Sequence, residues 1–442
     1  MTVKNVSVVG LGKVGSPMVA SFASRGFRAI GVDLDAEKVR LINQHRAPVV
    51  EPGLQEMITA HGERISATLD YAEAVSNSDI TFIIVPTPSR EDGGFSSKYA
   101  VEACTKIGHA LRNKSGFHLV VLASTVLPGT TGSDIEPTLE RSSGKRCGVD
   151  FGLCYSPRFI ALGSVIRDLM SPDLVLVGES DPTSGQMLEA FNRRFVTNNA
   201  PIVRMNYVNA ELAKIAVNTY VTTKITFANM LSSMCERLPG ANVDVVTSAL
   251  GLDTRIGAKY LRGAVGYGGP CFPRDNLALS CLGRQLGVPA TIAESTDALN
   301  RAQVTRIVKL VKATLPPGGK VGILGLAYKT QTDVTEESQG VELARQLSSD
   351  GVPVVVYDPM AMESARRVLK GSVRFASSVT DCAKEADALV LVTPWDEFKG
   401  LQPKDLAREG SRPTLLDCWR MLDPAKFADV ADYVALGVGP SR

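Results

Sequence analysis

The sequence predicts an α/β protein with an N-terminal Rossmann-type doubly wound parallel sheet, a central long-helix region and a C-terminal Rossmann-like unit. Three observations predict this class. Short apolar strands alternate with helical patterns up to residue 205, the alternation returns after residue 316, and one long helical pattern lies between. We therefore predict an α/β domain over 1–205, a central helical domain over 206–315, and a second α/β domain over 316–442.

Composition narrows the class of function. The chain has 442 residues, a net charge of +2 and interspersed charges, which indicate neither a nucleic-acid nor a membrane-surface partner. We recognise no signal peptide and no apolar run long enough to cross a bilayer. The eight cysteines show neither zinc spacing nor a dense disulfide framework, so we expect a reducing cytoplasm and no metal site.

The first strand and the turn after it are typical of a dinucleotide site. A strand over 6–9 leads into a glycine turn, a helix runs over 16–25, and a strand over 29–32 ends at Asp33. Gly15 allows the helix to pack closely on the sheet, and Asp33 can accept ribose hydroxyls but repels a 2′-phosphate, which favours NAD over NADP. A tight turn without a ligand is the alternative for the glycines alone. The predicted cofactor contacts here are Gly10, Gly12, Lys13, Val14, Gly15 and Asp33.

Hydroxyl side chains follow two later strands. Thr87 comes after a strand over 80–85, and Ser124 and Thr125 come after a strand over 118–123. Ligands bind at the carboxyl ends of parallel strands, so these are candidate cofactor or substrate contacts, although turns and caps use the same hydroxyls. Further strands are predicted over 151–155, 174–177 and 202–204.

The central region begins with one long helix, predicted over 206–238. Lys214, Asn218 and Thr222 recur every four residues and share one face. Such a stripe is commonly the solvated side of a helix. Between two α/β halves it indicates instead a dimer contact whose polar stripe faces an active cleft.

A glycine turn over 266–275 reads GYGGPCFPRD and carries Cys271. Pro273 favours the first turn of a helix, which places the thiol at a helix N-terminus with Arg274 beside it. Both features stabilise the reactive thiolate. An inert buried cysteine is the alternative reading of a single thiol.

A second α/β unit follows the linker PPGG over 316–319. A strand over 321–324 leads into Gly325, but the third glycine of the turn is missing. A helix over 338–347 and strands over 352–357 and 388–392 continue the unit. A degenerate nucleotide fold attached to a complete one suggests a substrate that is itself a nucleotide.

Together these elements resemble the UDP-glucose/GDP-mannose dehydrogenase family over residues 6–423. The motifs that carry the resemblance are GYGGPCFPRD over 266–275, ELAKIAVN over 211–218, GLAYK over 325–329 and DCWR over 417–420. The resemblance implies NAD binding by residues 1–205, dimerisation through 206–315 and nucleotide-sugar binding by 316–442. It also implies NAD-dependent, four-electron oxidation of a nucleotide-sugar C6 hydroxyl to the carboxylate. Cys271 would form a thiohemiacetal and then a thioester. UDP-glucose is the expected substrate, with UDP-N-acetylhexosamines and GDP-mannose as alternatives.

The resemblance also implies the roles of individual residues. Lys214 and Asn218 hold the reacting oxygen and its charge, and Asp275 helps a water or lysine act as base. Arg255 is expected to complete the neighbouring subunit's site in a homodimer. The implied catalytic set is Cys271, Lys214, Asn218, Asp275 and Thr125. The implied nucleotide-sugar contacts are Arg158, Phe159, Lys214, Asn218, Arg255, Tyr260, Leu261, Tyr267, Gly268, Phe272, Lys329 and Arg420.

Three positions depart from the family pattern. Arg158 and Leu162 stand where many members carry glutamates, of which the first assists thioester hydrolysis, and Glu336 stands where an NAD-contacting arginine is common. Arginine cannot act as a general base. The alternatives left open are a complete four-electron enzyme, one slow at hydrolysis, a non-catalytic binding homologue, and a two-electron hydroxyacid dehydrogenase. The last would need neither a nucleophilic cysteine nor a third domain.

Overall fold

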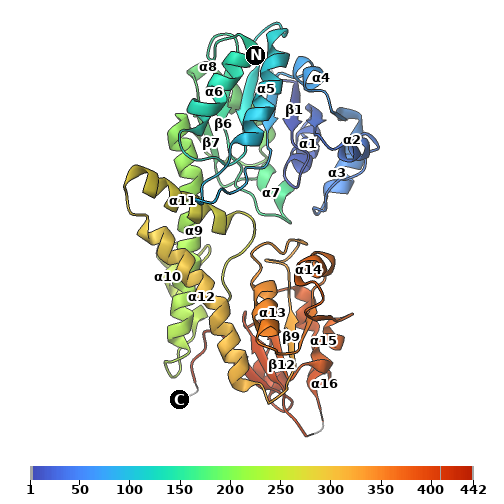
Figure 1. Ribbon diagram of the computed structural model, residues 1–442, viewed down its shortest axis with the longest axis vertical. Coiled ribbons are helices and arrows are strands. Elements are labelled where there is room, and N and C mark those ends of the chain that lie inside the picture. The colour runs from blue at the N-terminus through green and yellow to red at the C-terminus, as the bar shows by residue number, and fades with distance from the viewer. Residues whose placement is uncertain (1–2, 409, 441–442) are drawn as a thin grey trace. The chain divides into compact units, whose positions relative to one another are not determined.

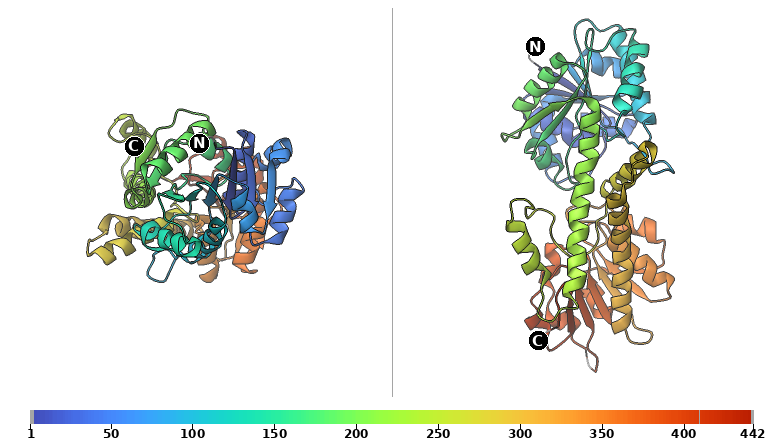
Figure 2. Two further views of the ribbon diagram at one scale, coloured as in Figure 1. Left: turned by 90° about the horizontal axis from the view of Figure 1, so that it is seen from above. Right: turned by 90° about the vertical axis from the view of Figure 1, so that its left-hand side faces the viewer.

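The structure is a computed structural model that describes residues 3–408 and 410–440. The chain divides into two compact units, Met1–Ala216 and Val217–Arg442. The boundary falls inside α9 (Tyr207–Cys235), which Figure 2 shows as one uninterrupted helix within the predicted range 206–238. Among the described residues, no helix has the length and apolar character needed to cross a membrane.

The first unit contains a mostly parallel sheet, ordered β3-β2-β1-β4-β5-β6-β7-β8 in its described residues. Antiparallel pairing of β6 with β7 is the departure from an all-parallel arrangement. The predicted doubly wound fold is confirmed, and β3 is a strand that the sequence patterns missed. The strands are β1 (Asn5–Val9), β2 (Arg28–Val32), β3 (Ile65–Thr68), β4 (Ile80–Ile83), β5 (Leu119–Leu122), β6 (Gly152–Tyr155), β7 (Val175–Glu179) and β8 (Ile202–Met205).

Helices cover both faces of this sheet (Figure 1). Helices α4, α5 and α6 pack in sequence, while α1 packs with α3 and α7. Because both faces are covered, β4, β5 and β6 are buried at every position, as expected for central strands of a parallel sheet. The helices are α1 (Gly15–Ser24), α2 (Ala36–Asn43), α3 (Leu54–His61), α4 (Tyr71–Ser76), α5 (Lys98–Arg112), α6 (Glu136–Ser143), α7 (Val165–Met170) and α8 (Pro182–Phe195), with a 3-10 turn η1 (Gly62–Arg64) and a π-helical turn η2 (Thr131–Ile135).

The second unit begins with helices and ends with a parallel sheet ordered β11-β10-β9-β12-β13-β14 in its described residues. The predicted second nucleotide fold is confirmed; β11, β13 and β14 were not predicted. Its strands are β9 (Val321–Leu324), β10 (Val354–Tyr357), β11 (Arg374–Phe375), β12 (Ala388–Leu391), β13 (Thr414–Asp417) and β14 (Asp432–Ala435). Its helices after α9 are α10 (Val243–Leu252), α11 (Phe272–Leu286), α12 (Thr291–Thr314), α13 (Gln339–Ser349), α14 (Met362–Leu369), α15 (Val379–Glu385), α16 (Pro403–Leu406) and α17 (Pro424–Phe427), with a 3-10 turn η3 (Asp396–Gly400).

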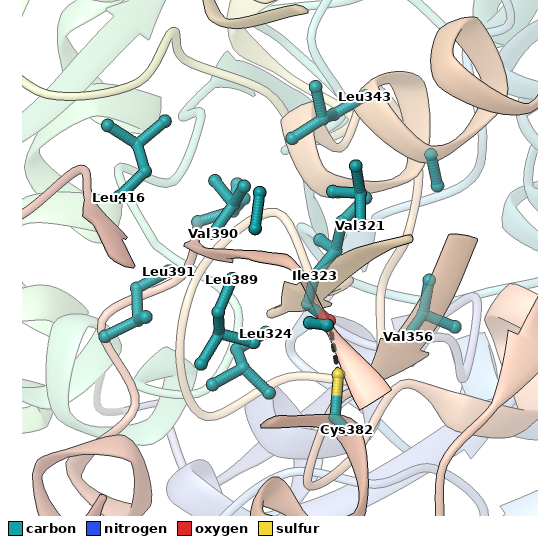
Figure 3. Close-up of a cluster of buried hydrophobic side chains, with 14 of the residues drawn as sticks. Val321, Ile323, Leu324, Leu343, Val356, Cys382, Leu389, Val390, Leu391 and Leu416 are labelled. Carbon is teal, nitrogen blue, oxygen red and sulfur yellow. Dashed lines mark hydrogen bonds between the residues drawn. The ribbon is translucent and has the colours of Figure 1, made fainter. Parts of the chain in front are cut away.

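The two sheets are packed with different side chains. In the first unit, Phe22 of α1 lies 5.0 Å from Phe82 of β4 and 5.2 Å from Phe191 of α8, measured between ring centroids. In the second unit, aliphatic side chains of β9 and β12 fill the core around Cys382, whose thiol faces the Ile323 carbonyl (Figure 3). Burial raises the pKa of Cys382 to about 12, so this thiol is a structural apolar group.

Candidate active site

The glycine turn of the first unit has the geometry of a dinucleotide cradle. Gly10 has φ +101°, and a Cβ there would lie 2.4 Å from the Ile84 carbonyl oxygen. A Cβ on Gly15 would lie 1.7 Å from the Gly10 carbonyl oxygen, so any side chain would push α1 off the turn. A Cβ on Gly12 would meet nothing within 4 Å. The turn is therefore closed on its packing side and open beside Gly12, where a pyrophosphate would approach.

Asp33 lies at the end of β2, as predicted. Its Oδ2 accepts a 2.6 Å hydrogen bond from the Leu11 N–H, which ties the acid to the glycine turn. Lys38 of α2 lies 3.3 Å from the same carboxylate. The sequence patterns missed Lys38; the signal was a cation in the first turn of the helix that follows the acid. The open turn and the acid together fit the pyrophosphate and ribose of a dinucleotide.

The predicted hydroxyls lie on the loops after β4 and β5. Ser124 uses its hydroxyl to bind Val85, accepting from its N–H at 2.9 Å and donating to its carbonyl at 2.7 Å. Ser124 therefore fixes the two loops to each other. Thr87 is buried and Thr125 is half-buried beside Ser124. A direct cofactor contact by these hydroxyls stays a prediction.

Glu211 of α9 is a buried carboxylate that holds the loop after β5. Its oxygens accept hydrogen bonds from the Gly129 N–H (2.6 Å), the Thr131 N–H (2.8 Å) and the Thr131 hydroxyl (2.6 Å). Burial raises its pKa. The motif over 211–218 contains Glu211, but the sequence patterns gave it no role because its partners lie some eighty positions earlier in the chain.

Lys214 lies one turn further along α9 and contacts the loop after β6. Its Nζ donates to the Arg158 carbonyl at 3.1 Å and lies 4.6 Å from the centroid of the Phe159 ring. The structure thus brings together Lys214 and Phe159, two of the predicted substrate contacts. Glu51 holds the end of the same loop, accepting from the N–H groups of Gly163 and Val165. The sequence patterns also missed Glu51.

Arg158 is directed into the protein rather than toward the loop surface. Its guanidinium lies 5.5 Å from the centroid of the Phe82 ring, with Nη1 3.4 Å from the Asn192 amide oxygen. Nε and Nη2 are buried and have no hydrogen-bond partner among the described residues. Burial lowers the pKa of Arg158 to about 10. Its side chain therefore does not take the position of a base on the loop, and the predicted substrate contact is reduced to its backbone carbonyl, which binds Lys214.

In the second unit, Cys271 is the N-cap residue of α11 and is exposed. Pro273 occupies the first turn of that helix, as predicted. The start of a helix carries unsatisfied N–H groups and a partial positive charge, which favour the thiolate form of a nearby cysteine. Among the cysteines that the structure describes, Cys271 alone is exposed; Cys147 is half-buried and the others are buried.

The two residues of the polar stripe that lie in the second unit, Asn218 and Thr222, face α11 and are buried. The Asn218 side-chain N–H donates to Asp275 at 2.6 Å, and both residues are buried. One turn further along α9, the Thr222 hydroxyl accepts a 2.9 Å hydrogen bond from Asn276 of α11. Asn276 also donates to the Tyr267 hydroxyl at 2.9 Å. Two of the predicted catalytic residues are thus in direct contact, and Asn276 is a connecting residue that the sequence patterns did not single out.

Aromatic residues surround the cysteine turn. Phe272 lies edge-to-face with Tyr267, at 6.2 Å between centroids, and with Tyr260, at 6.3 Å. Tyr260 is half exposed with φ +66°, whereas Leu261 and Tyr267 are buried. Gly268 packs so tightly that a Cβ would lie 2.2 Å from the Glu337 carbonyl oxygen. The structure therefore places the rings of Tyr260 and Tyr267 against Phe272, the residue that follows Cys271.

The three predicted phosphate-binding cations differ in their surroundings. Arg255 is exposed and pairs with Asp253 at 2.6 Å, in the turn that follows α10. Lys329 lies on the segment between β9 and α13. Arg420 is buried, and it donates to both carboxylate oxygens of Asp244 and to three backbone carbonyls. A phosphate contact by Arg420 would require one of these hydrogen bonds to break, so its predicted role stays open.

No cluster of three or more potential metal ligands occurs in residues 3–408 and 410–440. The chemistry that these groups can perform is nucleophilic and acid–base chemistry at an exposed thiol, beside a buried asparagine–aspartate pair.

Three family models match successive parts of the chain. They are the NAD-binding domain (residues 4–196), the central domain (208–302) and the UDP-binding domain (322–424) of the UDP-glucose/GDP-mannose dehydrogenase family. A UDP-glucose 6-dehydrogenase of Haloferax volcanii is 35% identical over 91% of this chain and 94% of its own length. A GDP-mannose 6-dehydrogenase of Pseudomonas putida is 37% identical over 80% of each chain. The solved structure of a UDP-glucose dehydrogenase from Pyrobaculum islandicum matches with a TM-score of 0.90 and 34% identity, covering 99% of this chain and 98% of that one.

Proposed function

The chain belongs to the UDP-glucose/GDP-mannose dehydrogenase family, and we propose that it oxidises the C6 hydroxyl of a nucleotide sugar to the carboxylate, with UDP-glucose as the first candidate. NAD is the cofactor, held by the open glycine turn and Asp33 of the first unit. The observation that carries the proposal is the exposed thiol of Cys271 at a helix N-terminus, beside the Asn218–Asp275 pair.

The reaction removes four electrons in two steps, and NAD, when bound, accepts the hydride in each of them. In the first step the hydroxyl loses its proton and C6 becomes an aldehyde carbon. The Cys271 thiolate then adds to that carbon, which forms a C–S bond and places negative charge on the sugar oxygen. Loss of the second hydride gives a thioester. Water cleaves the C–S bond, which releases the carboxylate and returns the thiol.

The residues around Cys271 are suited to holding the reacting oxygen. Asn218 is fixed by its 2.6 Å hydrogen bond to Asp275, so its amide is oriented without rearrangement. We assign the oxyanion contact to Asn218 and, from the family resemblance, to Lys214 as well. To Asp275 we assign the task of orienting the water or amine that removes protons. The aromatic edges of Tyr260, Tyr267 and Phe272 would enclose the sugar.

The departures from the family pattern bear on the last step. Arg158 is buried against Phe82, so neither its side chain nor that of Leu162 supplies a base for hydrolysis. We propose that Asp275 serves this step through a water molecule. The second candidate is an enzyme slow at hydrolysis. The absence of a base at Arg158 and Leu162 favours it, and such an enzyme would accumulate the thioester on Cys271.

Counting NADH per sugar tests the proposal. A complete enzyme releases two NADH per nucleotide sugar until the sugar is consumed. An enzyme slow at hydrolysis stops after a burst of up to two NADH per subunit and shows a covalent adduct on Cys271 by mass spectrometry, and a non-catalytic homologue releases none. Cys271→Ser should bind the nucleotide sugar as the wild type does but form no acid, while Cys147→Ser, a change at the half-buried thiol, should leave the yield unaltered. Full acid yield from Cys271→Ser would refute the role of the thiol. A panel of UDP-glucose, UDP-N-acetylhexosamines and GDP-mannose identifies the substrate by NADH release.

We also propose a homodimer that uses α9 and α10. Large apolar side chains on these helices are exposed, among them Tyr220 and Phe227 of α9 and Val245 and Leu252 of α10. Arg255, exposed directly after α10, is placed to act on a neighbouring subunit. If it does, mixing inactive Arg255→Ala and Cys271→Ser subunits should restore activity, because each mixed dimer has one intact site. A monomeric mass in solution, with no recovery on mixing, would contradict the proposal.

The expectation that the protein works in the cytoplasm remains a proposal as well. It is supported by the eight cysteines, all of which are thiols, with the proposed nucleophile exposed. Fluorescence microscopy of a tagged chain in its source cells would test it.

A further inference from the structure

The glycine turn of the second nucleotide fold is interrupted by a segment that packs on the cysteine turn. This segment, residues 328–339, lies between Ala327 and the glycine at position 340, and we call it the insert. The Glu336 carbonyl accepts a 3.0 Å hydrogen bond from the Gly269 N–H. A Cβ on Gly269 would lie 2.5 Å from the Tyr328 ring. The insert therefore forms one wall against which the turn 266–271 is held.

A single side chain forms a second wall. Asn300 of α12 is 5% exposed, and its amide brackets one residue of the turn. Its Oδ1 accepts from the Tyr267 N–H at 2.8 Å, and its Nδ2 donates to the Tyr267 carbonyl at 3.0 Å. Gln339, the last residue of the insert, donates to the same carbonyl at 3.4 Å. The backbone of Tyr267 is thus held at both of its polar groups, four residues before the thiol.

Gly266 packs closely against the two side chains that hold Tyr267. A Cβ on Gly266 would lie 2.5 Å from the Asn300 Oδ1 and 2.6 Å from the Gln339 Oε1. The Tyr267 hydroxyl is held by Asn276 of α11, the helix that Cys271 caps. The turn is consequently fixed at its backbone by α12 and at its side chain by α11. Glycine residues give the turn freedom, and these contacts remove it.

We propose that Asn300 is a positioning residue for the nucleophile: by bracketing Tyr267 it fixes the turn that sets where the Cys271 sulfur lies at the N-terminus of α11. Asn300 touches no reacting atom. The kinetic part of this inference rests on the proposed function, because it takes Cys271 to be the nucleophile. A displacement of about 1 Å at a reacting group can lower a rate by about a hundredfold. Loss of the Asn300 hydrogen bonds to Tyr267 should therefore lower the turnover rate strongly.

The chain offers a matched control. Asn229 of α9 makes the same kind of bracket, accepting from the Ala264 N–H at 2.8 Å and donating to the Val265 carbonyl at 3.0 Å. It is buried as completely as Asn300, but it holds residues that precede the glycine turn. The same substitution at either position therefore removes one buried hydrogen bond to a backbone carbonyl. Only at Asn300 does that hydrogen bond hold the turn that carries Cys271.

The test compares Asn300→Asp with Asn229→Asp. Aspartate keeps the oxygen that accepts from the backbone N–H but, when ionised, faces the carbonyl with a second oxygen. We expect Asn300→Asp to lower kcat by about ten- to a hundredfold with the KM for NAD unchanged, and to slow alkylation of Cys271 by iodoacetamide by about fivefold or more at pH 7.5. Peptide mass spectrometry confirms the alkylated residue. Asn229→Asp should lower the Tm comparably but change alkylation by less than about twofold.

A pH profile separates positioning from general damage. Burial raises the pKa of a carboxyl, and in its protonated form the introduced group can donate to the Tyr267 carbonyl again. The ratio of the Asn300→Asp rate to the wild-type rate should therefore rise as the pH falls from 8 to 5.5, for kcat and for alkylation alike. If Asn300→Asp does not fold, Gln339→Met removes a donor to the same carbonyl and should show a smaller effect in the same direction.

The outcomes separate this inference from the proposed function. Slower alkylation in Asn300→Asp and not in Asn229→Asp supports it, even if no sugar is found to be oxidised, because alkylation requires no catalysis. Equal loss of Tm in both variants with unchanged alkylation of Cys271 overturns it, whatever the enzyme's substrate proves to be.

Discussion

The two nucleotide folds of this chain have the same turn and use it differently. Gly10 and Gly325 follow the first strand of each fold with φ +101° and +107°. The acid after the second strand binds the turn in both, through Leu11 N–H to Asp33 at 2.6 Å and Leu326 N–H to Asp358 at 2.7 Å. The strand orders β3-β2-β1-β4-β5-β6 and β11-β10-β9-β12-β13-β14 correspond position by position.

The difference lies in what remains open. In the first fold a Cβ on Gly12 would meet nothing, and Asp33 stays near the surface beside Lys38. In the second, Ala327 stands at the position of Gly12 and is buried, and Asp358 is buried under five N–H donors. The same backbone therefore forms an open ligand-binding turn in the first fold. In the second fold the corresponding turn is buried by protein atoms and has a structural role. A repeated fold does not imply a repeated dinucleotide site.

The largest effect that sharpens this comparison is expected for Asp358→Asn. Both oxygens of Asp358 accept from N–H groups, so in either orientation the NH2 of an asparagine would face N–H donors, those of Ala327 and Trp395 or that of Ala361. We therefore expect a loss of about 3 kcal/mol in the free energy of unfolding of the second unit. Both tryptophans, Trp395 and Trp419, lie in that unit, so urea unfolding followed by tryptophan fluorescence measures it.

The matched change is Asp33→Asn, at an acid that water can reach. It should cost less than about 1 kcal/mol, measured by circular dichroism, and should weaken discrimination against NADP. Equal destabilisation by the two substitutions would break the comparison.

The free energies of unfolding of the two units should depend differently on pH, and this difference is expected to be smaller than the effect of Asp358→Asn. All four histidines lie in the first unit, and His118 is fully buried, with Thr81 and the Ser78 carbonyl as partners. Burial, with nearby Lys114, lowers the pKa of His118 to about 3. In the unfolded chain the pKa of this histidine is higher, near 6.5, so the contribution of neutral His118 to the free energy of unfolding is complete above pH 6.5. This contribution is lost toward pH 3, by up to about 1.4 kcal/mol per pH unit.

Urea unfolding at pH 7 and pH 5 measures this, with circular dichroism reporting both units and tryptophan fluorescence the second alone. Between these values the first unit should lose stability while the tryptophan transition changes less. His118→Gln should reduce the pH dependence. A tryptophan transition that shifts as far as the first unit's transition would count against the assignment.

The smallest expected effect, and the most specific one, is at the open side of the first turn. Gly12→Ala adds a methyl group where no protein atom lies within 4 Å, so the Tm without NAD should not change. The methyl group would occupy the side from which the pyrophosphate approaches, and we expect NAD affinity to fall at least about tenfold. Isothermal titration calorimetry measures this. Ala327→Gly is the control at the corresponding position and should leave NAD affinity as it is; an unchanged affinity in Gly12→Ala would mean that the turn is not the cradle.

Local rules in the sequence were sufficient for the first nucleotide fold. Gly10, Gly12, Gly15 and Asp33 were identified from spacing, since a glycine turn between a strand and a helix is a short-range pattern that requires no distant partner. The same rule failed in the second fold. The third glycine is not missing there: a Cβ on Gly340 would lie 2.0 Å from the Gly325 carbonyl oxygen, as at Gly15. The insert had moved it beyond the reach of a fixed spacing.

The sequence by itself determined the fold class, the open dinucleotide turn and the thiol at the start of a helix, because each depends on residues close together in the chain. Only the tertiary structure decided that Arg158 turns inward onto Phe82, that Glu211 holds the loop after β5, and that Asn300 brackets Tyr267. These choices depend on which buried donors and acceptors meet across distant segments. Burial makes an unpaired polar group costly, so partners are selected by the packed fold as a whole and leave no periodic mark in the sequence.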